Sequence, residues 1–329
     1  MACRIVTVPK ALEKEAHEEH QPGLEFSFCF AILSQNSIYP AMTFFIFGKW
    51  HVNPLWRFQA SGTIWRILFS PNDFIIGEER DQDRKIVRLF AINAADGKVL
   101  WVERELPEPW WTEIEACTES TIFVSEYAQP DLPIHAGITA LDLQTGEVLW
   151  RNPGVTFYFE LTGALIVKKE EITGTRFLKL GAQTGEVLED YGARVDEVSA
   201  LRALNQQEND VQLPFPYRGD AEGLEELRSL IQSILPKQGQ RGDVELLPAD
   251  PYVVLSFHVV DSKTEDGEER LAQRLMVINR DSSKVVFAHT LLNDARYPAM
   301  QSFAVRKGIL YFIENRDTLV AVNLQIGKL

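Results

Sequence analysis

One short segment recurs along this chain, and its recurrence limits the folds that the chain can adopt. The clearest copy, ALDLQTGEVLW, covers residues 140–150. Weaker copies are AINAADGKVLW (91–101), KLGAQTGEVLE (179–189), VINRDSSKVVF (277–287) and AVNLQIGKL (321–329). A strand–turn–strand unit copied in this way indicates one supersecondary element repeated around a ring or along a stack.

The spacing of the copies indicates four-stranded blades. Gly97, Gly146 and Gly185 occupy the same turn position and are separated by 49 and 39 residues. Ser283 fills this position 98 residues later, and Gly327 follows after another 44. Three of these intervals lie near the roughly 40–45 residues of a β-propeller blade, so the long interval predicts a blade that carries an insertion.

The residues of the clearest copy have separate structural tasks. Gly146 allows the positive φ of a tight turn, and the carboxylate of Asp142 can accept hydrogen bonds from turn amides. Trp150 can pack a large apolar face against a neighbouring unit. The residues expected to carry this architecture are Asp142, Thr145, Gly146 and Trp150, with Gly97, Trp101 and Trp56 in other units.

Two further apolar runs precede each turn segment, which gives four strands per unit and five units. The expected pairs are 63–69 and 74–79, 111–117 and 121–127, 155–161 and 164–170, 243–247 and 252–260, and 301–305 and 309–314. We therefore predict an all-β fold, a five-bladed β-propeller of four-stranded antiparallel blades.

The two ends of the chain predict how the ring closes. The last copy stops at Leu329 without an outer strand or terminal aromatic residue, whereas PLWRF (54–58) is an outer strand with no turn ahead of it. Trp56 precedes Trp101 by 45 residues, the length of one blade. We expect this N-terminal strand to complete the fifth blade and close the ring, which leaves no long unpaired sheet edge. A linear stack would need capping units, and neither end of the chain resembles one.

The insertion lies at about residues 193–241, in the fourth blade. Its segment 220–235 has apolar residues at helical spacing, with Asp220 as a candidate N-cap and Pro236 after the end. The apolar positions are Leu224, Leu227, Leu230, Ile231 and Ile234. We expect this helix to pack on a flank or face of the propeller. The alternatives are a lid or a helix that docks a partner.

Composition restricts the partners and the compartment. The formal net charge of −14 argues against a nucleic-acid partner, because phosphate binding needs a basic surface. Self-repulsion at this charge fits a soluble monomer. Cys3, Cys29 and Cys117 are too few and too scattered for a disulfide framework or a cysteine-based metal site, which favours a reducing, cytoplasmic location.

The N-terminal residues 1–41 are set apart from the domain. Their first half is charged and lacks the apolar core of a signal peptide. Segment 24–47 is more apolar, but polar residues and Pro40 interrupt it, so we expect no membrane span and no lipid anchor. We interpret 1–41 as a disordered tail or a misassigned start, and 42–329 as one propeller domain.

The pattern Ala-x-Asp-x-x-Thr-Gly-x-x-x-Trp at residues 140–150 resembles the tryptophan-docking repeat of the quinoprotein-type (PQQ-like) β-propeller superfamily. The copy at 91–101 is similar, whereas Glu189 replaces the tryptophan in the next copy. The resemblance covers about residues 50–329 outside the insertion. The superfamily contains quinone-dependent dehydrogenases, outer-membrane assembly scaffolds and many uncharacterised propellers. This short, five-unit chain looks most like an uncharacterised, non-enzymatic branch.

Departures from the superfamily argue against its cofactor. The dehydrogenases have eight blades, are exported and typically carry adjacent cysteines above the quinone. This chain has no Cys-Cys pair, and five blades leave a narrow axial channel. We therefore expect no bound quinone, no calcium and no other cofactor.

The sequence contains no recognisable motif for catalysis or metal binding. It has no phosphate loop, dinucleotide fingerprint or nucleophile elbow. His51, His135, His258 and His289 have no convincing partner in sequence, which is typical of structural or surface histidines. We predict no catalytic residue and no metal site.

The most unusual local segment is ELPEPWWTEIE (105–115), in which Trp110 and Trp111 follow a proline-stiffened loop. Loops on a rigid scaffold often carry function, so an aromatic mouth here could bind a peptide, a sugar or a cationic group. The residues expected to line it are Trp65, Arg66, Trp110, Trp111, Glu113, Glu115, Tyr158, Glu160 and Tyr297. The alternative is that the aromatic residues fill the gaps between blades.

The leading functional hypothesis is a non-catalytic binding or scaffold protein whose partner is an unknown protein or small molecule. The first alternative is a hydrolase or lyase that uses axial carboxylates, because Glu113 and Glu115 on one strand face could form an acid–base couple. Solvated channel charge is the simpler interpretation of these two residues. The second alternative is a degenerate quinoprotein.

Overall fold

The computed structural model describes residues 6–7, 53–129, 132–205, 210–217 and 225–327. In this part of the chain the fold is all-β with two α-helices, and the strands form five antiparallel sheets. The predicted N-terminal tail, residues 1–41, lies outside the described residues except for β1 (Val6–Thr7).

Each sheet contains the four main strands that the repeat predicts, and in the first four sheets these strands follow one another along the chain as an antiparallel meander. We number the sheets first to fifth in the order of the repeats. The first sheet contains β3 (Thr63–Phe69), β4 (Phe74–Asp81), β5 (Ile86–Asn93) and β6 (Val99–Glu105), and the second contains β7 (Thr112–Cys117), β8 (Thr121–Gln129), β9 (Leu132–Asp142) and β10 (Val148–Asn152). The third contains β11 (Thr156–Leu161), β12 (Ala164–Glu171), β13 (Gly174–Gly181) and β14 (Val187–Gly192), and the fourth contains β17 (Gln240–Ala249), β18 (Tyr252–Lys263), β19 (Glu269–Asn279) and β20 (Lys284–Ala295). The fifth contains β21 (Phe303–Arg306), β22 (Ile309–Glu314), β23 (Thr318–Asn323) and β2 (Trp56–Gln59).

The fifth sheet is built from strands that lie far apart in the sequence. Strand β2 pairs antiparallel with β23, with Trp56 opposite Ala321 and Phe58 opposite Leu319. Trp56 and Phe58 alternate with exposed residues, so both bury their side chains on one face of the sheet. The orphan outer strand expected from the sequence therefore pairs with the last repeat.

Three short strands that the repeat did not predict extend the inner edges of sheets. Strand β1 pairs with β3, β15 (Val211–Gln212) pairs with β21, and β16 (Phe215–Tyr217) pairs with β17. Both β15 and β16 come from the insertion. They satisfy backbone groups that would otherwise be unpaired at a sheet edge.

Three outer strands each carry a tryptophan that packs on the turn of the next sheet. The indole N–H of each donates a hydrogen bond to a backbone carbonyl just before that turn. The pairs are Trp56 to Ala94 at 3.1 Å, Trp101 to Leu143 at 2.9 Å and Trp150 to Ala182 at 2.9 Å. A ring that buries its apolar face and satisfies its N–H in this way joins two sheets in one contact.

The turn glycines are required by this contact as well as by the turn. Gly97 has φ of +70°, and a Cβ atom placed on it would lie 2.7 Å from the Trp56 ring. Gly146 and Gly185 have the same backbone conformation and face Trp101 and Trp150 in the same way. Positive φ and a ring in contact with the backbone both exclude a side chain at these positions.

Four apolar joints connect the five sheets. Hydrophobic clusters join the fifth sheet to the first, the first to the second, the second to the third, and the fourth to the fifth. At the joint between the fourth and fifth sheets, Phe287 takes the place of tryptophan and its ring lies 6.2 Å from Phe312. The third sheet has Glu189 at the docking position, and no cluster of described residues joins it to the fourth sheet.

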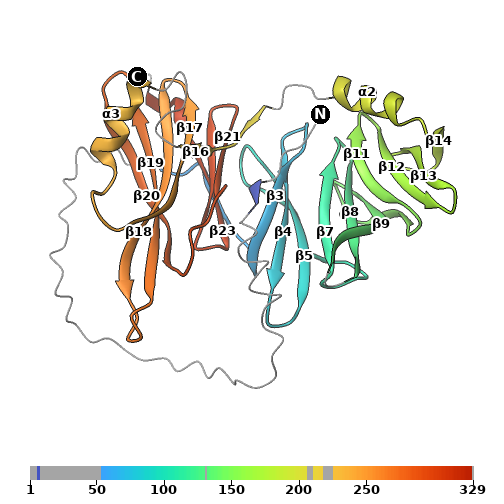
Figure 1. Ribbon diagram of the computed structural model, residues 1–329, viewed down its shortest axis with the longest axis horizontal. Coiled ribbons are helices and arrows are strands. Elements are labelled where there is room, and N and C mark those ends of the chain that lie inside the picture. The colour runs from blue at the N-terminus through green and yellow to red at the C-terminus, as the bar shows by residue number, and fades with distance from the viewer. Residues whose placement is uncertain (1–5, 8–52, 130–131, 206–209, 218–224, 328–329) are drawn as a thin grey trace.

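Helices from the insertion cover the free faces of the third and fourth sheets. Helix α2 (Val195–Asn205) packs Val198 against Phe159 and Phe177 of the third sheet. Helix α3 (Glu225–Ile234) packs Leu227 and Ile231 against the fourth sheet. Figure 1 shows these two sheets and their helices at opposite ends of the row of sheets.

The helices of the insertion therefore cap these two sheets. The predicted helix 220–235 is present over α3, while its candidate N-cap Asp220 lies outside the described residues. The α2 helix was not predicted. Apolar and polar residues are poorly separated between the faces of α2, and only Val198 is buried. Its sequence therefore lacks the helical period of apolar residues that would predict a helix.

We expect Trp56→Ala to destabilise the protein by about 3–5 kcal/mol, because it removes a buried aromatic ring at the joint between the fifth and first sheets. Chemical denaturation of wild type and variant measures this difference. Leu55→Ala is the matched control, since Leu55 is 44% exposed and a surface change should cost about 0.5 kcal/mol or less. Equal stability of the two variants would contradict the docking role.

Alanine substitutions at two glycines separate the cost of the docking contact from the cost of the turn. Gly97 and Gly163 have φ of +70° and +69°, but a Cβ at Gly163 would meet nothing within 4 Å. Both variants should lose about 1 kcal/mol or more from backbone strain. Gly97→Ala should lose at least about 1 kcal/mol beyond that, because the Trp56 ring must move. Denaturation midpoints that are equal for the two variants would disprove this reading.

Candidate functional site

Six of the nine residues expected to line a binding mouth lie together between the first and second sheets. Trp65 and Arg66 come from β3, while Glu113 and Glu115 come from β7. Trp110 and Trp111 precede β7 directly. The first and second sheets pack together, so the side chains of these inner strands meet at their joint.

The centre of this cluster is the buried guanidinium of Arg66. It forms an ion pair with Glu113, and its Nε lies 4.0 Å from Glu78 Oε2. Its Nη1 donates to the backbone oxygen of Ile114 at 2.9 Å. Burial by itself lowers the pKa of Arg66, but the two carboxylates outweigh it and leave the pKa raised, so the residue is cationic.

Two further charged residues, Glu78 and Arg80 of β4, complete the ionic network. Arg80 pairs with Glu78 at 2.7 Å and donates to the backbone oxygen of Thr112 at 3.0 Å. Glu78 accepts from the backbone N–H of Ile114 at 3.3 Å. Strand β7 is the inner edge of its sheet, so these side chains occupy backbone groups that no strand pairs with.

A second group of residues surrounds Glu113 and Glu115 on the other side. The Tyr127 hydroxyl donates to Glu113 at 2.5 Å. His135 Nδ1 lies 2.6 Å from Glu115, and His135 Nε2 lies 3.5 Å from Glu113. Tyr127 and His135 are cross-strand partners in β8 and β9. His135 therefore has partners that the local sequence does not reveal, because the register of this pair cannot be deduced from it.

The protonation states follow from these contacts. Burial raises the pKa of Glu113, but Arg66, the Tyr127 hydroxyl and His135 together lower it below its usual value. The hydrogen bond to Glu115 raises the pKa of His135 above 6.5 against the opposing effect of burial. Burial and the neighbouring Glu113 raise the pKa of Tyr127, so its phenol keeps its proton. Glu113 is thus a fixed carboxylate acceptor and not a proton donor.

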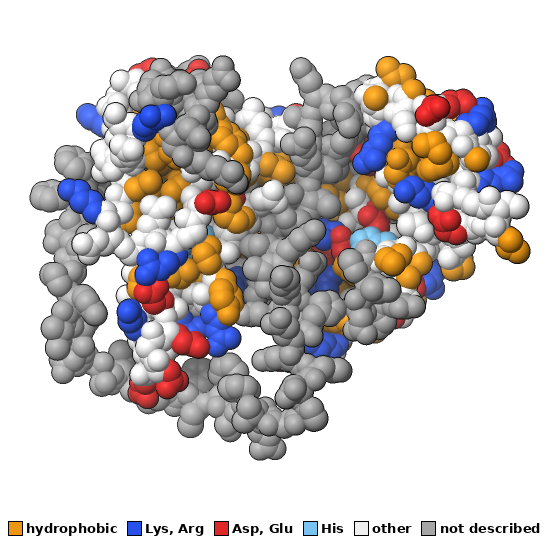
Figure 2. All heavy atoms as spheres, viewed as in Figure 1, with side chains coloured by type: hydrophobic (Ala, Val, Ile, Leu, Met, Phe, Trp, Pro, Cys, Tyr) orange, Lys and Arg blue, Asp and Glu red, His pale blue; other side chains and the backbone are white. Residues whose placement is uncertain are grey.

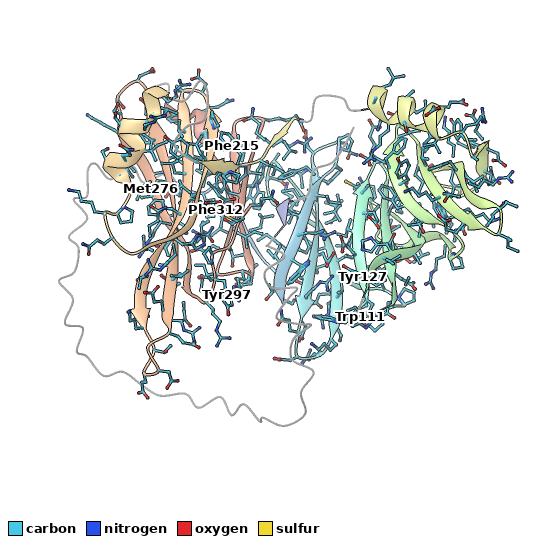
Figure 3. The ribbon with its side chains drawn as sticks, viewed as in Figure 1. Trp111, Tyr127, Phe215, Met276, Tyr297 and Phe312 are labelled. Carbon is cyan, nitrogen blue, oxygen red and sulfur yellow. The ribbon has the colours of Figure 1, made fainter. Side chains whose placement is uncertain are left out.

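Aromatic side chains cover the outer part of the network. The Arg80 guanidinium lies 5.0 Å from the Trp65 ring and 5.2 Å from the Trp110 ring. Trp111 contacts Tyr127 edge-on, with ring centroids 6.2 Å apart, and Figure 3 shows the two side chains beside each other on the second sheet. Trp110, Trp111 and Tyr127 are each partly exposed. Each of the two interpretations of these aromatic residues therefore holds for one of them. Trp65 is buried at the joint and fills space there, while Trp111 reaches the surface, where it could contact a ligand.

The other three predicted residues do not join this cluster. Tyr158 packs in the third sheet, where Lys168 and Arg202 lie 4.2 and 5.0 Å from its ring. The backbone oxygen of Glu160 accepts from Asn205 of α2. Tyr297 is half exposed and follows β20 of the fourth sheet, far from Trp111 in Figure 3. The nine predicted residues therefore do not line one shared mouth. Corresponding positions of different repeats face different surroundings because the sheets form a row whose ends are covered by helices.

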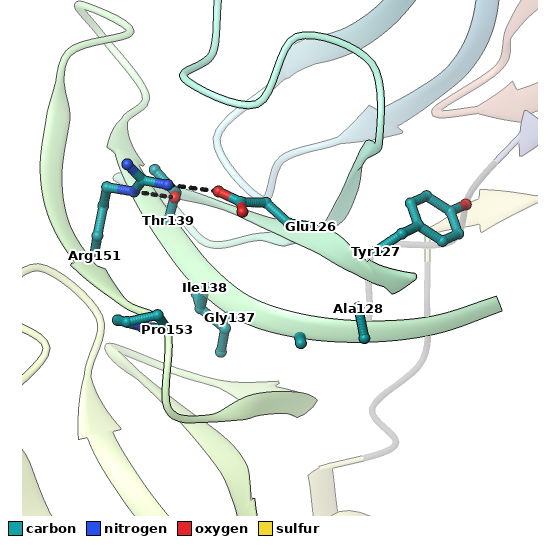
Figure 4. Close-up of a pocket in the computed structure, with 9 residues that line it drawn as sticks. Glu126, Tyr127, Ala128, Gly137, Ile138, Thr139, Arg151 and Pro153 are labelled. Carbon is teal, nitrogen blue, oxygen red and sulfur yellow. Dashed lines mark hydrogen bonds and ion pairs between the residues drawn. The ribbon is translucent and has the colours of Figure 1, made fainter. Parts of the chain in front are cut away.

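A shallow hollow of about 480 Å³ lies next to Tyr127, between β8, β9 and β10 (Figure 4). Its wall includes Arg151, which contacts Glu126 at 2.5 Å and Thr139 at 3.2 Å. Neither Glu113 nor Glu115 lines this hollow. It is partly open to solvent, and the charged residues in its wall, Glu126 and Arg151, pair with each other.

Charge on the visible surface is mixed. On the face in Figure 2, acidic and basic side chains are interspersed along the long hairpin of β18 and β19. Arg241 contacts Glu269 there at 2.7 Å. Among the described residues, no cluster of three His, Cys, Asp or Glu side chains is arranged to hold a metal ion. None of the helices in this part of the chain is both long and apolar enough to cross a membrane.

Comparison with known proteins gives a partial family match. A family profile described as "Domain of unknown function (DUF4905)" matches residues 70–150, which span most of the first and second sheets. No curated protein matches the chain.

Several solved structures share a distant likeness. BamB from Moraxella catarrhalis has 9% sequence identity and a TM-score of 0.26, with 77% of this chain and 80% of that chain covered. The Dos1 propeller has 7% identity and a TM-score of 0.27, with coverage of 78% and 66%. A eukaryotic initiation factor has 9% identity and a TM-score of 0.24, with coverage of 78% and 83%. At such TM-scores, none of these likenesses supports an inference about this chain.

The contact between His135 and Glu115 predicts a titration that NMR can measure. The His135 ring should titrate with a midpoint above 6.5, and Glu115→Gln should lower that midpoint. A group whose pKa rises on folding stabilises the fold below its unfolded pKa and loses this effect as pH rises through the folded value. His258 is the internal control, because burial lowers its pKa to about 4 and its ring should stay uncharged above pH 6. A His135 midpoint that Glu115→Gln leaves unchanged would show that the contact is absent in solution.

Proposed function

We propose that this chain is a non-catalytic binding or scaffold protein. The supporting observation is that its inner-strand charges are used within the fold. Arg66, Glu78 and Arg80 bind the free backbone edge of β7, and Glu113 is held ionised by Arg66 and Tyr127. Groups held in this way contribute to the joint between two sheets and have little freedom to exchange protons with a substrate.

The binding surface that we propose consists of Trp111, Tyr127, His135 and Glu115. It offers two partly exposed aromatic rings beside an acidic group, a combination suited to an aromatic, sugar or cationic group of a ligand. The partner would be a protein segment or a small molecule. The net charge of −14 and the three scattered cysteines support a soluble, cytoplasmic monomer that binds neither nucleic acid nor membrane.

We also propose that the five sheets are blades of one PQQ-like propeller, closed by its N-terminal strand. Support comes from the docking of Trp56, Trp101 and Trp150 on successive turns and from the pairing of β2 with β23. The third and fourth sheets lie at opposite ends of the row in Figure 1. A closed ring would therefore have to bring the helices α2 and α3 together between these sheets.

One observation favours the rival function, a hydrolase or lyase. His135 lies between Glu113 and Glu115, and its raised pKa would let it donate a proton near neutral pH. A degenerate quinoprotein is the third possibility. Quinone absorbance that persists on the protein after reconstitution and gel filtration would support that reading.

Ligand screening tests the proposed function on the full chain. Wild type, Trp111→Ala and Tyr297→Ala are probed on arrays of lysine-, arginine- and aromatic-rich peptides and of oligosaccharides. Loss of the Trp111 ring should lower the affinity for bound probes by about tenfold or more, as for a hot-spot aromatic residue. Tyr297→Ala is the control, because Tyr297 is an exposed aromatic residue away from the surface.

Two results would overturn the proposal. The first is probe binding that is the same in Trp111→Ala and wild type. The second is turnover of an ester, glycoside or other small substrate that wild type catalyses and that Glu115→Gln or His135→Gln abolishes. The second result would instead support the hydrolase or lyase.

A further inference from the structure

A second polar network lies at the joint between the fourth and fifth sheets, away from the surface described above. Glu245 on β17, Ser256 and His258 on β18, and Gln273 on β19 share one face of the fourth sheet. The neighbouring apolar residues on this face pack against the fifth sheet. All four polar side chains are 1–2% exposed.

This network binds the segment 299–302, which leads directly into β21. Gln301 donates its backbone N–H to Glu245, and Ala299 donates its backbone N–H to His258 Nε2 at 3.0 Å. Gln273 Nε2 lies 2.7 Å from Ser302 Oγ, 3.0 Å from Ser256 Oγ and 3.4 Å from the Ala299 oxygen. Gln301 has φ of 56°, a conformation that costs free energy and that these contacts hold in place.

Two atoms of the network, Glu245 Oε2 and His258 Nδ1, are buried without a hydrogen-bond partner among the described residues. An unpaired polar atom is costly when it is neutral and far more costly when it carries charge. His258 accepts a hydrogen bond at Nε2, so its neutral ring carries the proton at Nδ1. The joint is therefore compatible with neutral side chains and poorly compatible with charged ones.

In the part of the chain that the structure describes, no cation pairs with the Glu245 carboxylate. The groups that face it are Ser256 and His258 from β18, Gln273 from β19, and Gln301 and Ser302 from the segment that leads into β21. Only His258 among them titrates. Nearby Arg241 and Arg296 are paired with Glu269 and Glu268 at the exposed end of the sheet, and Asp243 is itself exposed.

We propose that ionisation of Glu245 releases the segment 299–302 and loosens the joint between the fourth and fifth sheets, so that the joint responds to pH near neutrality. Burial raises the pKa of Glu245 to about 7, against the opposing hydrogen bond from Gln301. Burial lowers the pKa of His258 to about 4, so His258 stays neutral while Glu245 changes charge.

The sign of the pH effect follows from these directions. An acid whose pKa is raised on folding contributes stability that is complete below its unfolded pKa. That contribution is lost as pH rises through the folded value, here about 7. Mild alkalinity should therefore weaken this joint.

Hydrogen exchange of the Ala299 and Gln301 amides tests the proposal. After correction for intrinsic exchange rates, the protection factors of these two amides in wild type should fall about tenfold between pH 6 and 8.5. The ionised fraction of a group with a midpoint near 7 rises by about the same factor over this range. Glu245→Gln keeps a hydrogen-bond acceptor but cannot ionise, so it should show less than about a twofold change. Glu265→Gln removes an exposed charge from the turn between β18 and β19 and should behave as wild type.

Equal pH dependence in wild type and Glu245→Gln would overturn the proposal. If Glu245→Gln fails to fold, NMR titration of the wild-type Glu245 carboxyl carbon decides the question. A midpoint near 7 that coincides with the loss of amide protection supports the proposal. A midpoint near 4.3, the ordinary value for glutamate, refutes it.

Discussion

The docking of a tryptophan ring on a turn glycine is the contact on which the arrangement of sheets depends. It occurs with the same geometry for Trp56, Trp101 and Trp150, each time with an indole N–H bound to a carbonyl ahead of the turn. Each antiparallel sheet could form from local hydrogen bonds alone, but its two faces need neighbours. The docked ring determines which sheet packs against which and how the two sheets are aligned. Where Glu189 replaces the ring, the row of sheets ends and a helix covers the face instead.

The residues of the repeat could be predicted from sequence because their function is local. A positive φ requires glycine, an aromatic residue must bury its face, and four strands of this length fill one repeat. The same logic identified β2 as the partner of the last repeat, since an outer strand was missing there. These constraints involve neighbouring residues or neighbouring repeats, and periodicity reveals both.

Other features escaped prediction because they depend on contacts across sheets. The part played by Glu78 and Arg80 follows from the free edge of β7, which lies in another sheet. His135 gained two carboxylate neighbours through the register of β8 and β9. Tyr158 and Tyr297, which lie near the corresponding positions of other repeats, face unrelated surroundings. A repeat predicts where a side chain stands in its own unit, and the ends of the row change what surrounds it.

The fifth sheet has a consequence for synthesis of the chain. Its outer strand β2 is made long before β23, the strand that pairs with it, and Arg57 and its ion-pair partner Glu314 are 257 residues apart. At about 5–20 residues per second, the ribosome needs roughly 10–50 s to make the intervening chain. During that time Trp56 and Phe58 have no completed sheet to join, although the turn that receives Trp56 already exists. Early docking of the Trp56 ring on the first sheet would keep these two aromatic residues from other chains until β23 is made.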